Sequence, residues 1–238
     1  MRLFILNLMI LLFSLTSLPS IAIDQEPVLS SLVKTTSCDD QKECLYTYTL
    51  ATYIGRAIVQ AESIIGPRDK DYTILGYEFT DNPAPQIWFP GNRKHVVIQL
   101  TRQAMLEKKR ALYQLGHEVF HTLSPIVGNG NALEEGLATE FSLDFVKNLN
   151  IKITPDYINS KNYTSAYYLI GCLRNFEPKL NSKLQQLRSD GHQIGNSSSK
   201  VLLGYLRNTP VKLLRILAKK LPEFDKQDHQ KISSCLTN

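Results

Sequence analysis

The sequence predicts an α+β protein in which a small mixed sheet is followed by a largely helical second half. Two observations lead to this prediction: strand-like segments cluster between residues 72 and 100, and helical patterns fill most of the chain after residue 101. The chain has 238 residues, of which 43% are hydrophobic and 21% charged, so it can bury a sizeable core. We expect residues 23–150 to form an α+β part with the functional site and residues 151–238 a helical part that completes the same domain.

The N-terminus has the pattern of an export signal. Arg2 supplies a positive charge, residues 3–13 form an apolar run, and Ser20 and Ala22 are the small residues of a cleavage site. We expect residues 1–22 to be a signal peptide that is cleaved after Ala22, which predicts a secreted or periplasmic protein. An uncleaved membrane anchor is the alternative, but the apolar run is short for a span. No stable membrane insertion is expected after cleavage.

The charge of the chain is mildly basic, with a formal net charge of +5 at pH 7. The densest basic runs, at residues 108–110 and 219–220, are short and flanked by residues that favour helices. We interpret them as solvated helix faces, with a patch for an anionic partner as the alternative. No nucleic-acid partner is expected.

Four cysteines follow the signal: Cys38, Cys44, Cys172 and Cys235. An even number in an exported chain predicts two disulfides, and three pairings are possible. We favour Cys38 with Cys44, which closes a small polar loop, and Cys172 with Cys235, which would hold the C-terminal tail against a helix. The spacings are not those of a cysteine-rich zinc site, so metal chemistry falls to the histidines.

The region between residues 45 and 100 is expected to hold one helix and three strands. Apolar residues recur at spacings of three and four over residues 45–65, and Gly66-Pro67 ends this helix. Runs rich in β-branched and aromatic residues then predict strands at 72–79, 86–89 and 95–100.

Helices are predicted for most of the remaining chain. Thr101 is expected to cap a helix over residues 102–123, and Ser124-Pro125 ends it. A second helix is expected over 132–148, where Gly136 would let the two helices approach closely. The other predicted helices cover 163–188, 198–206 and 211–221.

The segment His-Glu-Val-Phe-His at residues 117–121 lies in the first of these helices. His117 and His121 are one helical turn apart, so both imidazoles face the same side and can hold one Zn²⁺. Glu118 lies beside the first histidine and can reach a water on the metal. A strand precedes this helix, and we expect it to be an edge strand whose unpaired backbone groups bind a substrate.

A zinc site of this kind needs a third protein ligand and an open position for water. No third histidine follows at the spacing of the longer zinc motifs, so the third ligand is expected to be a carboxylate. The nearest downstream candidates are Glu134 and Glu135, at the start of the second helix. Thr139, Glu140 and Asp144 are within plausible reach as partners that orient the imidazoles.

These residues resemble the gluzincin class of zinc metallopeptidases. Residues 133–139, Leu-Glu-Glu-Gly-Leu-Ala-Thr, are similar to the Asn-Glu-Gly-Phe-Ala-Thr/Ser signature of the M1 aminopeptidase family. The match places the third zinc ligand at Glu135 and puts Glu134 at the family's Asn. The segment Tyr-Leu-Ile-Gly that begins at Tyr168 resembles the family's Tyr-x-x-Gly segment. The resemblance covers about residues 115–172 and implies a compact zincin-like catalytic domain.

The resemblance implies hydrolysis of a peptide bond by a zinc-activated water. His117, His121 and Glu135 would hold one Zn²⁺ per chain, and Glu118 would act as general base. Tyr168 would stabilise the oxyanion, with Tyr167 and His192 as alternative donors. Glu134 is the alternative third ligand, or only a partner of the helix dipole.

The departures from the family concern specificity. The spacing between the histidine motif and the ligand Glu is shorter than in M1 enzymes, and their Gly-x-Met-Glu-Asn segment, which holds a substrate's amino terminus, is absent. Endopeptidase and exopeptidase action both stay open. The expected partner is a peptide or protein substrate. The alternative functions are a catalytically silent binding protein with this fold and a zinc amidase that acts on cell-wall or other non-protein amides.

Overall fold

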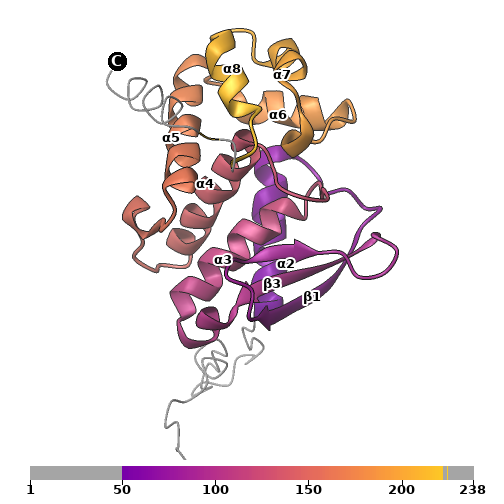
Figure 1. The fold of residues 1–238 in the computed structure, drawn as a ribbon, viewed down its shortest axis with the longest axis vertical. Coiled ribbons are helices and arrows are strands. Elements are labelled where there is room, and N and C mark those ends of the chain that lie inside the picture. The colour runs from indigo at the N-terminus through magenta and orange to yellow at the C-terminus, as the bar shows by residue number, and fades with distance from the viewer. Residues whose placement is uncertain (1–49, 222–223, 225–238) are drawn as a thin grey trace, which may run out of the picture.

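The structure is a computed structural model that describes residues 50–221 and residue 224. These residues form seven α-helices, three short 3-10 turns and one three-stranded sheet (Figure 1). The predicted α+β class, with a small mixed sheet followed by helices, is confirmed. The expected signal peptide and the cysteines at 38, 44 and 235 lie outside the described residues.

The sheet contains β1 (Thr73–Thr80), β2 (Gln86–Trp88) and β3 (His95–Thr101), in the spatial order β1-β3-β2. β1 pairs with β3 in parallel, whereas β2 pairs with β3 antiparallel. Helices α2 (Leu50–Ile65) and α3 (Lys108–His121) pack against this sheet (Figure 1).

The prediction that the strand before the metal helix is an edge strand is wrong. β3 lies in the middle of the sheet, and the short strand β2 forms the edge beside it. The physical reason is that β3 is buried: nearly every residue after His95 exposes less than a tenth of its surface. A strand in such a position has a neighbouring strand on each side. Of the two edge strands, β1 and β2, it is β2 that lines the cavity beside the two histidines.

The predicted helix over residues 102–123 is two elements. A 3-10 turn, Arg102–Leu106, ends at Glu107, which adopts an extended conformation before α3 begins. Thr101 does not cap this element with its side chain. Its hydroxyl and backbone N–H instead donate hydrogen bonds to the side-chain oxygen of Gln114. These bonds connect the end of β3 to the middle of α3.

The second helix is confirmed as α4 (Ala132–Asn148), but the predicted helix over 163–188 is split. α5 (Lys161–Phe176) ends at Glu177, and α6 (Leu180–Ser189) begins after Pro178. Proline has no backbone N–H and disfavours helical backbone in the residue before it. The remaining helices are α7 (Ser199–Tyr205) and α8 (Val211–Leu217), and they pack with α6 at one end of the molecule (Figure 1).

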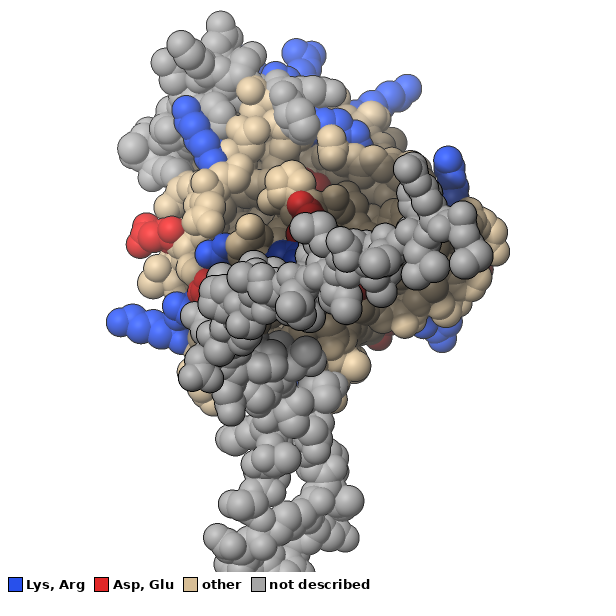
Figure 2. Space-filling view, turned by 60° about the horizontal axis from the view of Figure 1, so that its bottom comes forward, with Lys and Arg blue, Asp and Glu red and all other residues tan. Residues whose placement is uncertain are grey.

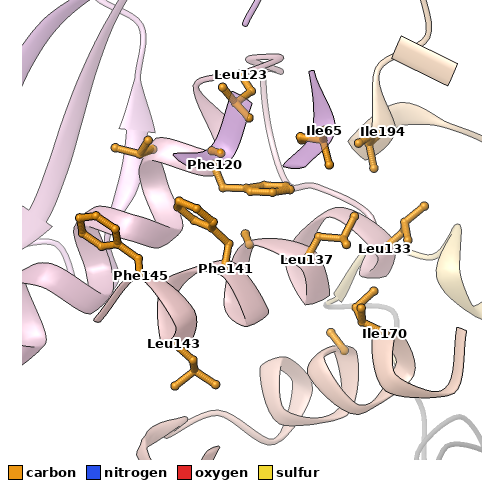
Figure 3. Packing of buried hydrophobic residues seen from close by; sticks show 14 of the residues in the cluster. Ile65, Phe120, Leu123, Leu133, Leu137, Phe141, Leu143, Phe145, Ile170 and Ile194 are labelled. Atoms are coloured by element: carbon orange, nitrogen blue, oxygen red, sulfur yellow. The ribbon is translucent and has the colours of Figure 1, made fainter. Parts of the chain in front are cut away.

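One continuous apolar core joins the sheet half to the helical half. Phe120 of α3 packs against Phe141 of α4, and Phe141 stacks on Phe145, while Ile170 of α5 approaches α4 from the other side (Figure 3). Cys172, also in α5, is fully buried and disulfide-bonded, and the favoured pairing with Cys235 stays a prediction.

Two glycines set the spacing around α4. A Cβ at Gly116 would lie 3.1 Å from the backbone of Ser142, so Gly116 permits the close contact between α3 and α4. Gly136 faces the other way: a Cβ there would overlap the carbonyl of Ala166 and lie 2.8 Å from Ile170 of α5. The expectation that Gly136 lets α3 and α4 approach closely is therefore wrong. Gly136 instead permits the close contact between α4 and α5.

None of the helices within residues 50–221 is both long and apolar enough to cross a membrane. On the face shown in Figure 2, Lys and Arg side chains are scattered and do not gather in one patch.

Replacing Gly136 by Ala should destabilise the fold by about 1–3 kcal/mol, because the added methyl group pushes α5 away from α4. Each kcal/mol lowers the melting temperature of a domain of this size by about 2–4 °C. Thermal unfolding followed by circular dichroism measures the change. Gly171→Ala in α5 is the control, since a Cβ at Gly171 meets nothing within 4 Å. Equal melting temperatures for both variants would contradict the packing role of Gly136.

Candidate metal centre

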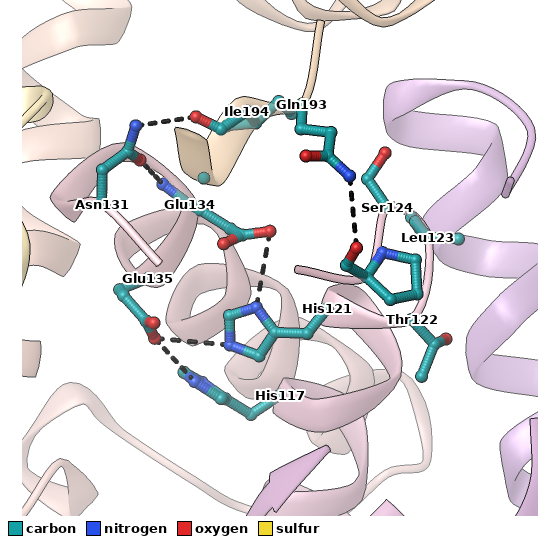
Figure 4. Close-up of polar contacts among 12 residues, drawn as sticks. His117, His121, Thr122, Leu123, Ser124, Asn131, Glu134, Glu135, Gln193 and Ile194 are labelled. Atoms are coloured by element: carbon teal, nitrogen blue, oxygen red, sulfur yellow. Dashed lines mark hydrogen bonds and ion pairs between the residues drawn. The ribbon is translucent and has the colours of Figure 1, made fainter. Parts of the chain in front are cut away.

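The candidate metal centre is formed where the end of α3 meets the beginning of α4. His117 and His121 occupy the last turns of α3, one turn apart as the sequence predicted. Asn131 caps α4, because its side-chain oxygen accepts a hydrogen bond from the backbone N–H of Glu134 at 3.0 Å. This cap fixes the first turn of α4, and Glu135 in that turn points at both histidines (Figure 4).

The three predicted ligands are brought together. The Nε2 atoms of His117 and His121 lie 3.2 and 3.4 Å from the same oxygen of Glu135. One ligand atom from each of the three side chains lies within 4.8 Å of the others. His117 and Glu135 are buried, and His121 is nearly so. Two imidazoles and one carboxylate in this arrangement match the donor set of a zinc site that keeps one position open.

Glu118 borders the cluster without belonging to it. It is buried, and it lines two neighbouring cavities of about 370 and 410 Å³ that share His117, Glu118 and Tyr163 in their walls. The first cavity contains the three ligands and runs along the edge strand β2. Glu118 therefore lies in the wall that the two cavities share.

Tyr168, the predicted oxyanion donor, does not reach the cluster. It is 37% exposed, and its ring packs on the adjacent Tyr167. Neither tyrosine lines the two cavities beside Glu118. His192 lines a different hollow and packs against Tyr205. None of these three residues lines either of the two cavities beside Glu118, and their role as oxyanion donors stays a prediction.

Tyr163 occupies the place expected for Tyr168. It lies in the first turn of α5, its ring centroid is 5.4 Å from that of His117, and it lines both cavities. Burial, together with the carboxylates of Glu135 and Glu118, raises the pKa of the Tyr163 phenol well above its ordinary value, so it stays a hydrogen-bond donor. The sequence offered one sign of this position: Tyr163 lies in the first turn of the helix that follows α4. The resemblance to the M1 family selected Tyr168 instead.

The residues expected to orient the imidazoles have other partners. Thr139 donates its hydroxyl to the backbone carbonyl of Glu135, Glu140 pairs with Arg174, and Asp144 contacts Lys147. Glu134 lies against His121 instead, 3.6 Å from its Nδ1 (Figure 4).

The buried charges of the cluster stabilise one another. Burial alone disfavours the charged form of His121, but the carboxylates of Glu135 and Glu134 outweigh it and raise its pKa well above the ordinary value. Burial would raise the pKa of Glu135, yet His121 and His117 hold it far below its usual range. Burial also raises the pKa of Glu118, opposed by the two histidines. Without a metal, the neighbouring carboxylates therefore favour the protonated form of His121.

Comparison of the chain with family models, curated proteins and solved structures found no match.

Zinc binding at pH 7 should release about one proton, because His121 must lose its proton before it can donate a lone pair to the metal. Apparent zinc affinity should therefore rise with pH until the folded-state pKa of His121 is passed. Titration calorimetry in buffers of different ionisation enthalpy counts the protons. Glu118→Gln is the control: if zinc binding to this variant still releases a proton, that proton does not come from Glu118. Binding heat that is independent of buffer would contradict the protonated His121.

Proposed function

We propose that the protein is an exported, gluzincin-like zinc metallopeptidase that hydrolyses peptide bonds. The observation that supports this proposal best is the convergence of His117, His121 and Glu135 on one point, with Glu118 beside them in the wall of a cleft. The three ligands alone would serve a metal-binding protein equally well. A buried carboxylate that borders the ligands and faces the cleft is the feature that hydrolysis requires.

A zinc ion held by His117, His121 and Glu135 would supply a Lewis acid that polarises a carbonyl and lowers the pKa of water toward about 7. Glu118 accepts a proton from the attacking water and passes it to the leaving nitrogen. Burial raises the pKa of Glu118, which makes its carboxylate a stronger base than an exposed one. The neighbouring imidazoles limit this rise, so that Glu118 remains able to exchange its proton.

Tyr163 donates a hydrogen bond to the oxygen that becomes negative as the carbonyl is attacked. Its hydroxyl belongs to a half-buried side chain in the walls of both cavities. A donor that is positioned in advance for the developing charge contributes more to the transition state than to the ground state.

The substrate's backbone pairs with the free edge of β2, and a side chain enters the cavity beside Glu118. No other strand of the described residues pairs with the outer edge of β2, and Gln86, Ile87 and Trp88 line the cleft. An unpaired strand edge binds extended peptides through its N–H and C=O groups.

The neighbouring cavity of about 410 Å³ favours a bulky, neutral side chain next to the cleaved bond. Tyr113 and Tyr157 lie in its wall, and the Tyr157 hydroxyl donates to Glu107 at 2.9 Å. The other carboxylate oxygen of Glu107 pairs with Arg110, which also lines the cavity. With these polar groups already paired within the protein, the tyrosine rings are left to contact the substrate.

Glu118→Gln should keep the zinc and lower kcat by about 10²–10⁴-fold, because the amide cannot accept the proton of the attacking water. A peptide-library digest with and without a chelator measures activity, and elemental analysis measures zinc. The same pair of proteins assayed on cell-wall amides identifies the amidase alternative. Hydrolysis that survives in Glu118→Gln would overturn the proposed mechanism, and a zinc-loaded wild type without any hydrolysis would assign a binding function.

Tyr163→Phe should lower kcat by about 10²–10³-fold with little change in KM, since the lost hydrogen bond acts mainly in the transition state. Tyr168→Phe removes the same hydroxyl from an exposed ring that lies outside both cavities and should leave kcat unchanged. Steady-state kinetics on one peptide compares the two variants. The opposite pattern would return the oxyanion role to Tyr168.

A further inference from the structure

We propose that Glu134 is a positioning residue for the metal ligand His121, and that a slot between Gly130 and Gly195 holds Glu134 in place. The inference rests on the proposed zinc site. It adds a charged residue and a segment of the helical half to that site, where the resembled family has an uncharged Asn.

The two nitrogens of His121 face two different carboxylates. Nε2 lies 3.4 Å from Glu135, toward the ligand cluster, whereas Nδ1 lies 3.6 Å from an oxygen of Glu134 (Figure 4). A carboxylate beside Nδ1 favours the tautomer with its proton on that nitrogen, which leaves the lone pair of Nε2 for a metal. Glu134 therefore selects both the orientation and the tautomer of His121.

Glu134 is closely surrounded beside His121. Only 3% of the residue is exposed, and its second oxygen, Oε2, is the one buried side-chain polar atom of the described residues without a hydrogen-bond partner. A Cβ at either Gly130 or Gly195 would overlap this oxygen. The Cβ at Gly195 would also lie 2.8 Å from Ile126. The carboxylate thus fills a slot whose walls are two glycine backbones.

The wall at Gly195 belongs to the 3-10 turn Ile194–Asn196, which is fixed to the start of α4. The amide of Asn131 donates to the carbonyl of Ile194 at 2.7 Å, and the backbone N–H of Asn131 donates to that of Gly195 at 3.1 Å (Figure 4). Lys220 donates to the same Gly195 carbonyl at 2.9 Å. Asn131 both caps α4 and holds this 3-10 turn. The distance between the slot and α4 is therefore fixed.

Glu134 changes the charge of the site as well as its geometry. With neutral imidazoles, Glu134 is one of three buried carboxylates, with Glu118 and Glu135, that face the two positive charges of Zn²⁺. An Asn or Gln in place of Glu134 would remove one of these negative charges and weaken the attraction for the cation. A carboxylate behind the imidazole also raises the basicity of the ligand nitrogen.

The first test is the zinc affinity of Glu134 variants, measured by competition with a chromogenic chelator. Glu134→Ala should weaken zinc binding about 10–100-fold, the usual loss when a partner of a metal-bound histidine is removed. Glu134→Gln keeps a hydrogen-bond acceptor and should lose less. Asp144→Ala, an exposed carboxylate on the same helix, is the control and should bind as the wild type does. Wild-type affinity in Glu134→Ala would overturn the positioning role and leave the proposed function standing.

The second test uses Gly195→Ala, which touches no ligand. Its methyl group should displace Glu134 and weaken zinc binding, whereas in the Glu134→Ala background only the flexible end of Ile126 lies close to the methyl group and much less further loss should follow. Gly204→Ala, where a Cβ meets nothing within 4 Å, is the matched control. An equal loss from Gly195→Ala in both backgrounds would overturn the slot. A folded wild type that binds no zinc would remove this inference together with the proposed function.

Discussion

The close contact between α3 and α4 is the constraint on which the rest of the site depends. Gly116 allows the two helices to approach until a Cβ would touch the Ser142 backbone, and the phenyl rings of Phe120 and Phe141 fill the space beside this contact. At this separation the first turn of α4 delivers Glu135 to the two histidines of α3. A larger side chain at position 116 would widen the gap between the helices, and the carboxylate and imidazoles would no longer share one point.

The site concentrates ionisable groups that the core would otherwise exclude. Glu118, Glu134 and Glu135 are buried within reach of His117 and His121, and the opposite charges stabilise one another because they lie together. Buried ion pairs add little to folding stability, since the loss of hydration offsets most of the attraction between the charges. A buried oxygen without a partner, as in Glu134, is a further cost. Such a cluster is typical of a site that binds a ligand, and less so of one that stabilises the fold.

Both halves of the chain take part in the site. The sheet supplies β2 at the mouth of the cleft, α5 supplies Tyr163, and the turn at Gly195 closes the space behind Glu134. These contacts join segments that are dozens of residues apart in the sequence. The core is correspondingly continuous from α2 to α8, so the helical half serves as a structural part of the site and not as a separate appendage.

The sequence by itself determined the local features: the helical turn that pairs His117 with His121, the choice of Glu135 as the third member, and the α+β order of elements. The helical turn and the order of elements follow from spacing and from the preferences of neighbouring residues, whereas only the resemblance of residues 133–139 to the gluzincin signature distinguished Glu135 from Glu134. Only the tertiary structure decided that β3 is central and that Tyr163, and not Tyr168, faces the cleft. It also decided that the carboxylate of Glu134 lies between Gly130 and Gly195. Those outcomes depend on how helices and strands from distant parts of the chain pack, and side-chain periodicity within one element carries no information about that packing.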